Sequence, residues 1–245
     1  MHTHTPHSHS HTTLYKGGFT LMELSIVLVI IGLVIGGVLS GQSLLRAADI
    51  SAVASDTGKY ASAVNQFAQQ YNALPGDFNW ATRQWSNTTN GDGDGRIESN
   101  DERVLAWQHM LLGGFVTGEY SGAAAGSDRT AFGVNLPESS INGAGFAIEY
   151  NAPQSSNSGA LWAGLHGHEI VFGRRTGNNE NYGAAIPPAE AERIDEKIDD
   201  GRIGTGFMTS VLSLGACRTG TNANSAEYDV SVDDNACAYF FRIGR

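Results

Sequence analysis

Cysteine and basic residues are scarce in this chain of 245 residues. Its two cysteines, Cys217 and Cys237, exclude a multi-cysteine zinc cluster, and their spacing is not that of a redox pair. Lys and Arg number 15 against 25 Asp and Glu, and the net charge of −10 argues against general binding to nucleic acid or to anionic lipid surfaces. With 31 glycines and only four methionines, the composition favours a loop-rich domain that contains β-structure.

One long uncharged run, from Leu24 to Leu45, follows a single glutamate, Glu23. A helix over this run is about 33 Å long, which is enough to cross a bilayer. A secretory signal peptide would have a shorter apolar centre and a cleavage site after it, which this run lacks. The sequence therefore predicts a membrane helix. A carboxylate at its start costs on the order of 3 kcal/mol and needs a compensating partner.

The stretch "GFTLMEL", Gly18 to Leu24, followed by the apolar run, resembles the signal of type IV prepilins and type II secretion pseudopilins. The resemblance implies cleavage after Gly18 by a prepilin peptidase and N-methylation of the new first residue, Phe19. It also implies that Glu23 pairs with the N-terminal ammonium of a neighbouring subunit during assembly. Such a pair makes a buried carboxylate tolerable, and a snorkelling glutamate in a plain anchor is the alternative.

The resemblance divides the chain into a leader (1–18), a transmembrane and assembly helix (19–45) and a periplasmic or extracellular domain (46–245). The leader holds five of the eight histidines and one lysine, Lys16, whose cytoplasmic placement fits the positive-inside tendency. Family leaders are usually shorter and basic. Translation from Leu14 is therefore an alternative, and it would leave residues 1–13 outside the protein.

A hydrophobic stripe continues the helix beyond the membrane segment. Val53, Tyr60, Val64, Phe67 and Tyr71 recur at helical spacing, which predicts one helix from about Phe19 to about Tyr71. Pro75 and Gly76 then forbid its continuation.

Shorter elements follow the long helix. Helices are expected at "FNWATRQW", "DERVLAWQHMLL" and "PPAEAERIDEKI", the second with Val104, Leu105, Leu111 and Leu112 on its inner face. Antiparallel strands are expected at "GAGFAIEY", "HEIVFGRR" and "CAYFFRIGR". The fold class is therefore α+β and pilin-like, with the long helix packed on a small antiparallel sheet.

The stretch "NGDGDGRIESND" has the spacing of a calcium loop. Asn90, Asp92 and Asp94 supply alternating oxygen ligands, the carbonyl of Arg96 supplies another, and Asp101 closes the sphere. Asp101 stands where EF-hands place glutamate, as in dockerin-type loops, so Glu98 or Glu102 is an alternative. An ordinary Asn/Gly/Asp turn is the competing interpretation. Oxygen ligands without a Cys or His pair favour Ca²⁺ over zinc.

Three weaker signals remain. An oxidising location favours a disulfide between Cys217 and Cys237, an arrangement that type IV pilins often have near the C-terminus. His166 and His168 would share one side of a strand next to Glu169, but they make an incomplete metal site. The tryptophans Trp80, Trp85 and Trp107 are expected to pack around the calcium loop rather than to bind sugars or bases.

The sequence lacks a nucleophile elbow, a zinc-protease helix and a P-loop, so we expect no enzyme. The first hypothesis is a minor pilin or pseudopilin that waits in the inner membrane, with its C-terminal domain in the periplasm, and is extracted into a filament. Its expected partners are the prepilin peptidase and methyltransferase, other subunits and the inner-membrane assembly platform. The second is a calcium-dependent adhesin-like module at a filament tip, with binding loops between Gly113 and Asn142. A periplasmic enzyme on a helical anchor is the third.

Overall fold

The computed structural model describes residues 18–122, 131–151, 167–176, 180–211, 214–220, 222 and 224–244. The leader up to residue 17, His166 and part of the loops expected to bind a ligand lie outside the described residues. The chain divides into two compact units, Met1–Arg46 and Ala47–Arg245.

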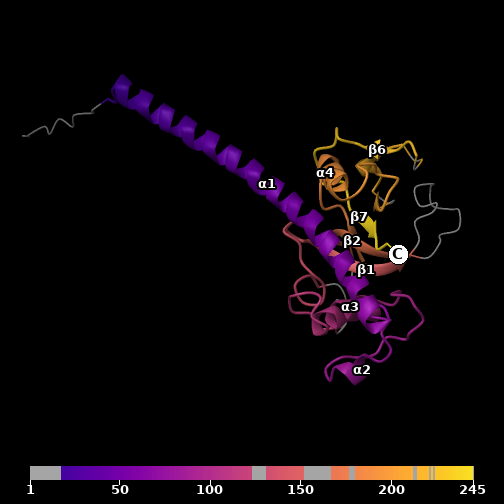
Figure 1. Ribbon diagram of the computed structural model, residues 1–245. Coiled ribbons are helices and arrows are strands. Elements are labelled where there is room, and N and C mark those ends of the chain that lie inside the picture. Colours follow the sequence, from indigo (N-terminus) through magenta and orange to yellow (C-terminus); the bar gives the residue numbers. More distant parts are fainter. Residues whose placement is uncertain are drawn as a thin grey trace, which may run out of the picture. The chain divides into compact units, whose positions relative to one another are not determined.

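Helix α1, Leu21–Tyr71, passes through both units and confirms the long helix expected from the hydrophobic pattern (Figure 1). In the N-terminal unit its large apolar side chains are exposed, and the helix is long and apolar enough to cross a membrane by length and composition. From Ile50 onward, a stripe of its residues is buried within the second unit. Asn72 adopts a left-handed backbone conformation at φ 51°, just before Pro75, and the helix stops there.

Three short helices follow: α2, Ala81–Gln84; α3, Asn100–Leu112; and α4, Pro188–Ile198. Helix α3 begins with a capping box, because the side chain of Ser99 accepts from the backbone of Glu102 and that of Glu102 accepts from the backbone of Ser99. Val104 and Leu105 are buried, as expected, but Leu112 is 37% exposed. Trp107 and Met110 fill the inner face of α3 instead, one helical turn apart.

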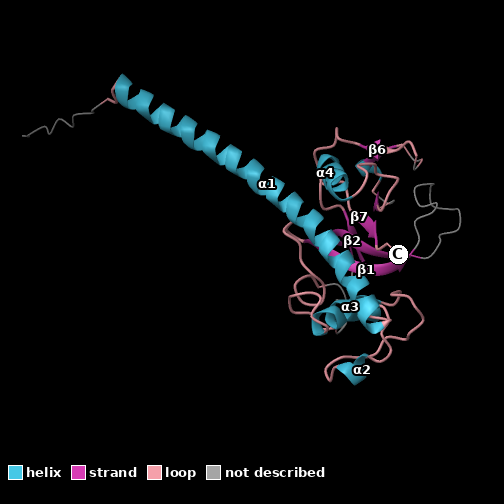
Figure 2. Cartoon of the chain, in the orientation of Figure 1, coloured by secondary structure: helices cyan, strands magenta, loops and turns pink. Residues whose placement is uncertain are grey.

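The main sheet is antiparallel, with strands in the order β1-β2-β7-β4 and β3 paired to β2. Figure 2 labels β1, β2 and β7 of this sheet. Its strands are β1, Ala144–Asn151; β2, Gly167–Thr176; β3, Glu180–Gly183; β4, Met208–Ser210; and β7, Tyr239–Arg242. Strands β5, Arg218–Thr219, and β6, Glu227–Tyr228, form a separate pair. The three expected strands correspond to β1, β2 and β7. The α+β, pilin-like fold class is therefore confirmed.

The C-terminal half of α1 packs on this sheet. The hydroxyl groups of Thr57 and Tyr239 lie 2.6 Å apart, and the Tyr60 ring meets the Phe146 ring edge to face at 5.1 Å between centroids. Trp107 of α3 contacts Tyr60 from another side, at 4.9 Å. One core thus joins α1, α3 and the sheet.

The predicted disulfide between Cys217 and Cys237 is present, and both cysteines are buried. It connects the short 3₁₀ turn at Gly215–Cys217 to the residue two before β7. Backbone hydrogen bonds between Cys237 and Ile186 tie the same point to the segment before α4. The bridge therefore anchors the C-terminal strand to two other parts of the domain.

Two glutamates lie opposite each other on β1 and β2. Glu149 and Glu169 are register partners, and both are buried. A guanidinium nitrogen of Arg103 lies 3.1 Å from a carboxylate oxygen of Glu149, and the Asn151 amide donates to Glu169 at 2.6 Å. Arg242 is the register partner of Glu169 on β7. Two like charges are thus held in the sheet by groups from three elements.

The pKa of Glu169 is raised to about 7, mainly by burial and also by the Glu149 carboxylate, against the opposing effects of the Asn151 hydrogen bond and the Arg242 charge. The folded protein therefore binds this proton more tightly than the unfolded chain, and the free energy of unfolding falls as pH rises from about 4.5 to about 7. We expect the fall in the free energy of unfolding over this pH range to be smaller in Glu169→Gln than in wild type, by on the order of 2 kcal/mol.

Urea unfolding of the calcium-free protein at about pH 5 and about pH 7.5 measures this slope. Burial raises the pKa of Asp195 to about 7 as well, so some of the slope should remain in Glu169→Gln. Glu227→Gln, at an exposed position, is the matched control and should leave the slope unchanged. Equal slopes in wild type and Glu169→Gln would contradict the assignment.

Candidate functional site

The N-terminal residues form the first candidate site. Gly18, Phe19 and Thr20 precede α1 in non-helical conformation, and Phe19 is 86% exposed. The Glu23 carboxylate accepts hydrogen bonds from the backbone and the hydroxyl of Thr20, both at 2.9 Å, and the Glu23 backbone donates to the Thr20 hydroxyl at 3.2 Å. This reciprocal pair is a capping box at the start of α1.

The capping box gives Glu23 a local role that the sequence interpretation missed, although the pattern Thr-x-x-Glu was available to indicate it. A carboxylate in the first turn is also stabilised by the helix dipole. The box uses the backbone N–H of Thr20 and not the backbone nitrogen of Phe19, which would become an amine on the predicted cleavage, so capping and an intersubunit ion pair are compatible. Pairing with a neighbouring subunit stays a prediction.

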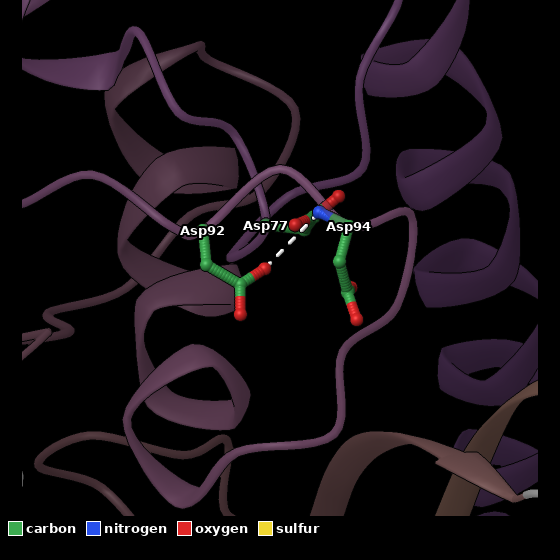
Figure 3. Close-up of side chains that lie close together, drawn as sticks. All are labelled: Asp77, Asp92 and Asp94. Atoms are coloured by element: carbon green, nitrogen blue, oxygen red, sulfur yellow. Dashed lines mark hydrogen bonds between the residues drawn. The ribbon is translucent and has the colours of Figure 1, made fainter.

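The acidic loop forms the second candidate site. One carboxylate oxygen each from Asp77, Asp92 and Asp94 lie within 4.8 Å of one another (Figure 3). Asp92 accepts from the backbone of Asp94 at 3.1 Å, and Asp94 accepts from the backbone of Arg96 at 2.8 Å. These bonds fold the loop so that alternate carboxylates approach one centre, as the spacing of Asp92 and Asp94 predicted.

Asp77 is the member of this group that the sequence interpretation missed. It follows the Pro75-Gly76 turn after α1, is 4% exposed, and accepts from the backbones of Gly93 at 2.7 Å and Gly95 at 3.0 Å. Both glycines have left-handed backbones, at φ 79° and 88°, which non-glycine residues rarely adopt. Asp77 thereby connects the end of α1 to the acidic loop.

The close carboxylates of this group repel one another, so their ionised forms are unfavourable without a nearby cation. Burial raises the pKa of Asp77 to about 6, the hydrogen bonds from Gly95 and Gly93 lower it, and the nearby Glu102 and Asp94 raise it. A bound cation would relieve this repulsion. Calcium takes about six to eight oxygen ligands, and three clustered carboxylates fit that donor chemistry.

The other expected ligands have different neighbours. The side-chain oxygen of Asn90 accepts from the backbone of Thr82 at 2.9 Å, so it braces the segment after Asp77. Asp101 is exposed in the first turn of α3 and is not a member of the acidic group. The Glu102 carboxylate caps α3 and accepts from the backbone of Asp92 at 3.4 Å. The carbonyl of Arg96 stays a predicted ligand, and the Arg96 guanidinium, which was not expected to bind the ion, lies 3.6 Å from Glu98.

A groove of about 820 Å³ opens beside the acidic group. Asp77, Gly93 and Gly95 are among its lining residues, together with His168 and Arg242 from the sheet. Asp77 can therefore be reached from solvent through this groove despite its burial.

His168 and the three tryptophans that were expected near the loop differ in their surroundings. The His168 ring accepts from the backbone of Ile97 at 3.2 Å, which ties β2 to the end of the loop. Trp107 packs on Tyr60, and Trp85 packs on Phe67 and Tyr71, so both lie against α1, and their packing around the acidic loop stays a prediction. Trp80 differs, because it is 56% exposed and its ring lies under the Arg83 guanidinium.

A second acidic group contains Asp195, in the last turn of α4, and Asp199 and Asp200 after the helix. Its carboxylates already accept hydrogen bonds: Asp195 from Tyr228 and Gly201, Asp199 from Met208, and Asp200 from Thr205 and Arg202. These contacts brace the turn that follows α4. Asp77, Asp92 and Asp94 also accept backbone hydrogen bonds, and what sets their group apart is the groove that opens beside it.

Comparison with known proteins gave one family match. No curated protein and no solved structure matched the chain. Residues 14–39 match the family described as the prokaryotic N-terminal methylation motif. This range includes Gly18, Phe19 and Glu23 and the start of the apolar helix. The chain therefore carries the N-terminal methylation signal of type IV pilins and pseudopilins, ahead of a pilin-like α+β domain.

Proposed function

We propose that this protein is a non-enzymatic structural subunit, a minor pilin or pseudopilin, of a type IV pilus or a type II secretion-like filament. The methylation signal at residues 14–39 carries the proposal, and the long helix packed on a small antiparallel sheet supports it. Residues 1–18 form the leader, 19–45 the membrane and assembly helix, and 46–245 the domain on the periplasmic side.

In this proposal a prepilin peptidase in the inner membrane cuts the bond between Gly18 and Phe19, and the amine of Phe19 is methylated. Glu23 then pairs with the Phe19 ammonium of a neighbouring subunit as the assembly platform extracts the helix into the filament. The ion pair compensates a carboxylate that would otherwise be costly in an apolar bundle. Cleavage must come first, because it creates the cation.

Immunolabelling of surface filaments tests the structural role. Labelling along the shaft is expected for a structural subunit. Labelling confined to the tip would favour a minor-pilin role or the calcium-dependent adhesin-like module. Absence of the protein from every filament fraction, including a periplasmic pseudopilus, would contradict the proposal.

We further propose that the acidic loop binds Ca²⁺ through the carboxylates of Asp77, Asp92 and Asp94. Their convergence, the raised pKa of Asp77 and the oxygen-only donor set support the proposal. Such a site joins the turn after α1 to the loop before α3, so an ion there would stabilise the domain. An extracellular structural site can be weak, with a dissociation constant of about 10⁻⁴–10⁻³ M.

Calcium at about ten times its dissociation constant should stabilise the wild-type protein by roughly 1.4 kcal/mol. The double variant Asp92→Asn/Asp94→Asn should lose this gain, because its amides leave the ion with one carboxylate of the three. Thermal unfolding with calcium and with chelator measures both effects. Asp234→Asn, at an exposed position that is not part of the acidic group, is the matched control and should respond like wild type. A wild-type protein whose unfolding is the same with calcium and with chelator would contradict the calcium site.

A further inference from the structure

His109 lies on α3 beneath the acidic loop and is fully buried. Its ring stacks on Phe67 of α1 at 6.3 Å between centroids and lies 6.0 Å from the Trp85 ring. These contacts hold the plane and position of the imidazole. A buried histidine in an aromatic cluster is often a simple core residue, so its hydrogen bonds decide what it does.

Both ring nitrogens of His109 bind the segments that carry the acidic group. Nδ1 accepts from the backbone of Gly76, the residue before Asp77, at 3.0 Å. Nε2 lies 3.1 Å from the Thr89 carbonyl oxygen and 3.1 Å from the Thr88 hydroxyl. Because Nδ1 accepts, the neutral ring carries its proton on Nε2, which can then donate to Thr89. One rigid ring therefore connects Gly76, next to Asp77, with Thr88 and Thr89, which precede the acidic loop.

The two segments lie in direct contact, which makes their spacing sensitive to this brace. The backbone of Gly91 donates to the Phe78 carbonyl at 3.1 Å. A Cβ at Gly91 would clash with the Gly76 carbonyl oxygen, so only glycine fits between the two backbones. A shift of Gly76 relative to Thr89 would therefore move Asp77 relative to Asp92 and Asp94.

We propose that His109 is the positioning residue of the acidic site, setting the distance between Asp77 and the Asp92–Asp94 loop by bonding Gly76 and Thr89 with one neutral imidazole. The inference rests on the calcium proposal and deepens it by naming the group that organises the site. The ring is suited to the task because burial lowers the pKa of His109 to about 4, which keeps Nδ1 available as an acceptor.

The test compares His109→Phe with His109→Asn in the full-length protein in detergent. Phenylalanine keeps an aromatic ring in the cluster and removes both hydrogen bonds. Asparagine places an oxygen near the position of Nδ1 and retains the bond to Gly76. Val104→Ala is the matched control for lost core stability, because Val104 is buried on the same helix and its aliphatic side chain offers the loop no hydrogen bond.

Two measurements are made on each variant. Calorimetric titration with CaCl₂ gives the affinity, and amide hydrogen exchange of the metal-free protein reports on residues 76–77 and 91–96. We expect His109→Phe to weaken calcium binding by about 10-fold or more, His109→Asn to recover some of the loss, and Val104→Ala to leave the affinity unchanged. We also expect faster exchange at both segments in His109→Phe than in Val104→Ala.

The exchange measurement separates this inference from the calcium proposal. If wild type does not bind calcium but His109→Phe selectively loosens both segments, the calcium proposal fails and the positioning role of His109 stands. If His109→Phe and Val104→Ala show the same affinity and the same exchange at these segments, His109 is a core residue only and the inference is overturned.

Discussion

Glu23→Ala should reduce incorporation into filaments at least about ten-fold while leaving membrane insertion and cleavage after Gly18 intact. An unpaired carboxylate in an apolar environment costs on the order of 3 kcal/mol, and an intersubunit ion pair turns that cost into a preference for assembly. With alanine, the helix enters the membrane equally well, but a neighbouring subunit no longer has a carboxylate to meet its N-terminal ammonium. Quantitative immunoblots of membrane and sheared-filament fractions measure the effect.

The capping box at Thr20 and Glu23 makes Glu23→Gln the decisive companion variant. Glutamine can still cap the helix but carries no charge. If the charge drives assembly, Glu23→Gln fails as Glu23→Ala does. If helix capping is what assembly needs, Glu23→Gln assembles normally and only Glu23→Ala fails. Normal incorporation of both variants would remove Glu23 from the assembly mechanism.

Replacing both Cys217 and Cys237 with alanine should lower the free energy of unfolding by roughly 3 kcal/mol. The bridge closes a loop between residues 20 apart in sequence, which restricts the unfolded chain. It also holds β7, whose Tyr239 hydroxyl lies 2.6 Å from that of Thr57 on α1. Its loss should therefore loosen the packing of the sheet on the long helix.

Denaturant unfolding in the presence and absence of reductant measures this contribution. Reductant should destabilise the wild-type protein by a similar amount and leave the double alanine variant unchanged. The variant therefore serves as the control for effects of reductant that do not involve the bridge. An equal response of both proteins to reductant would show that the effect does not come from this bridge.

The long helix and the three main strands could be predicted because their patterns are local. In α1 apolar residues recur at a period of about 3.6, and β1, β2 and β7 contain runs of β-branched and aromatic residues. Both patterns can be read from the sequence alone. Strands β4, β5 and β6 are two or three residues long, too short for any period to show. Leu112 was placed on the wrong face because the last turn of α3 ends at the surface.

The candidate site was predictable only where its residues are neighbours in sequence. Asp92 and Asp94 are two residues apart in one loop, and this spacing predicted that their side chains would lie close together. Asp77 joins them because the domain folds the end of α1 against the loop, and that contact has no local pattern. Asn90 satisfies the ligand spacing, and the fold adds that its side-chain oxygen accepts from the backbone of Thr82, so its place among the ligands stays a prediction.

The central claim is that this chain is processed at its N-terminal signal and then built into a filament. The most direct measurement is the N-terminal residue of the protein in purified filaments, obtained by mass spectrometry of its first peptide. The account predicts a peptide that begins at Phe19 and carries one methyl group on its amine. Filament-associated protein that retains Gly18 and the residues before it, in cells with an active prepilin peptidase, would contradict the account.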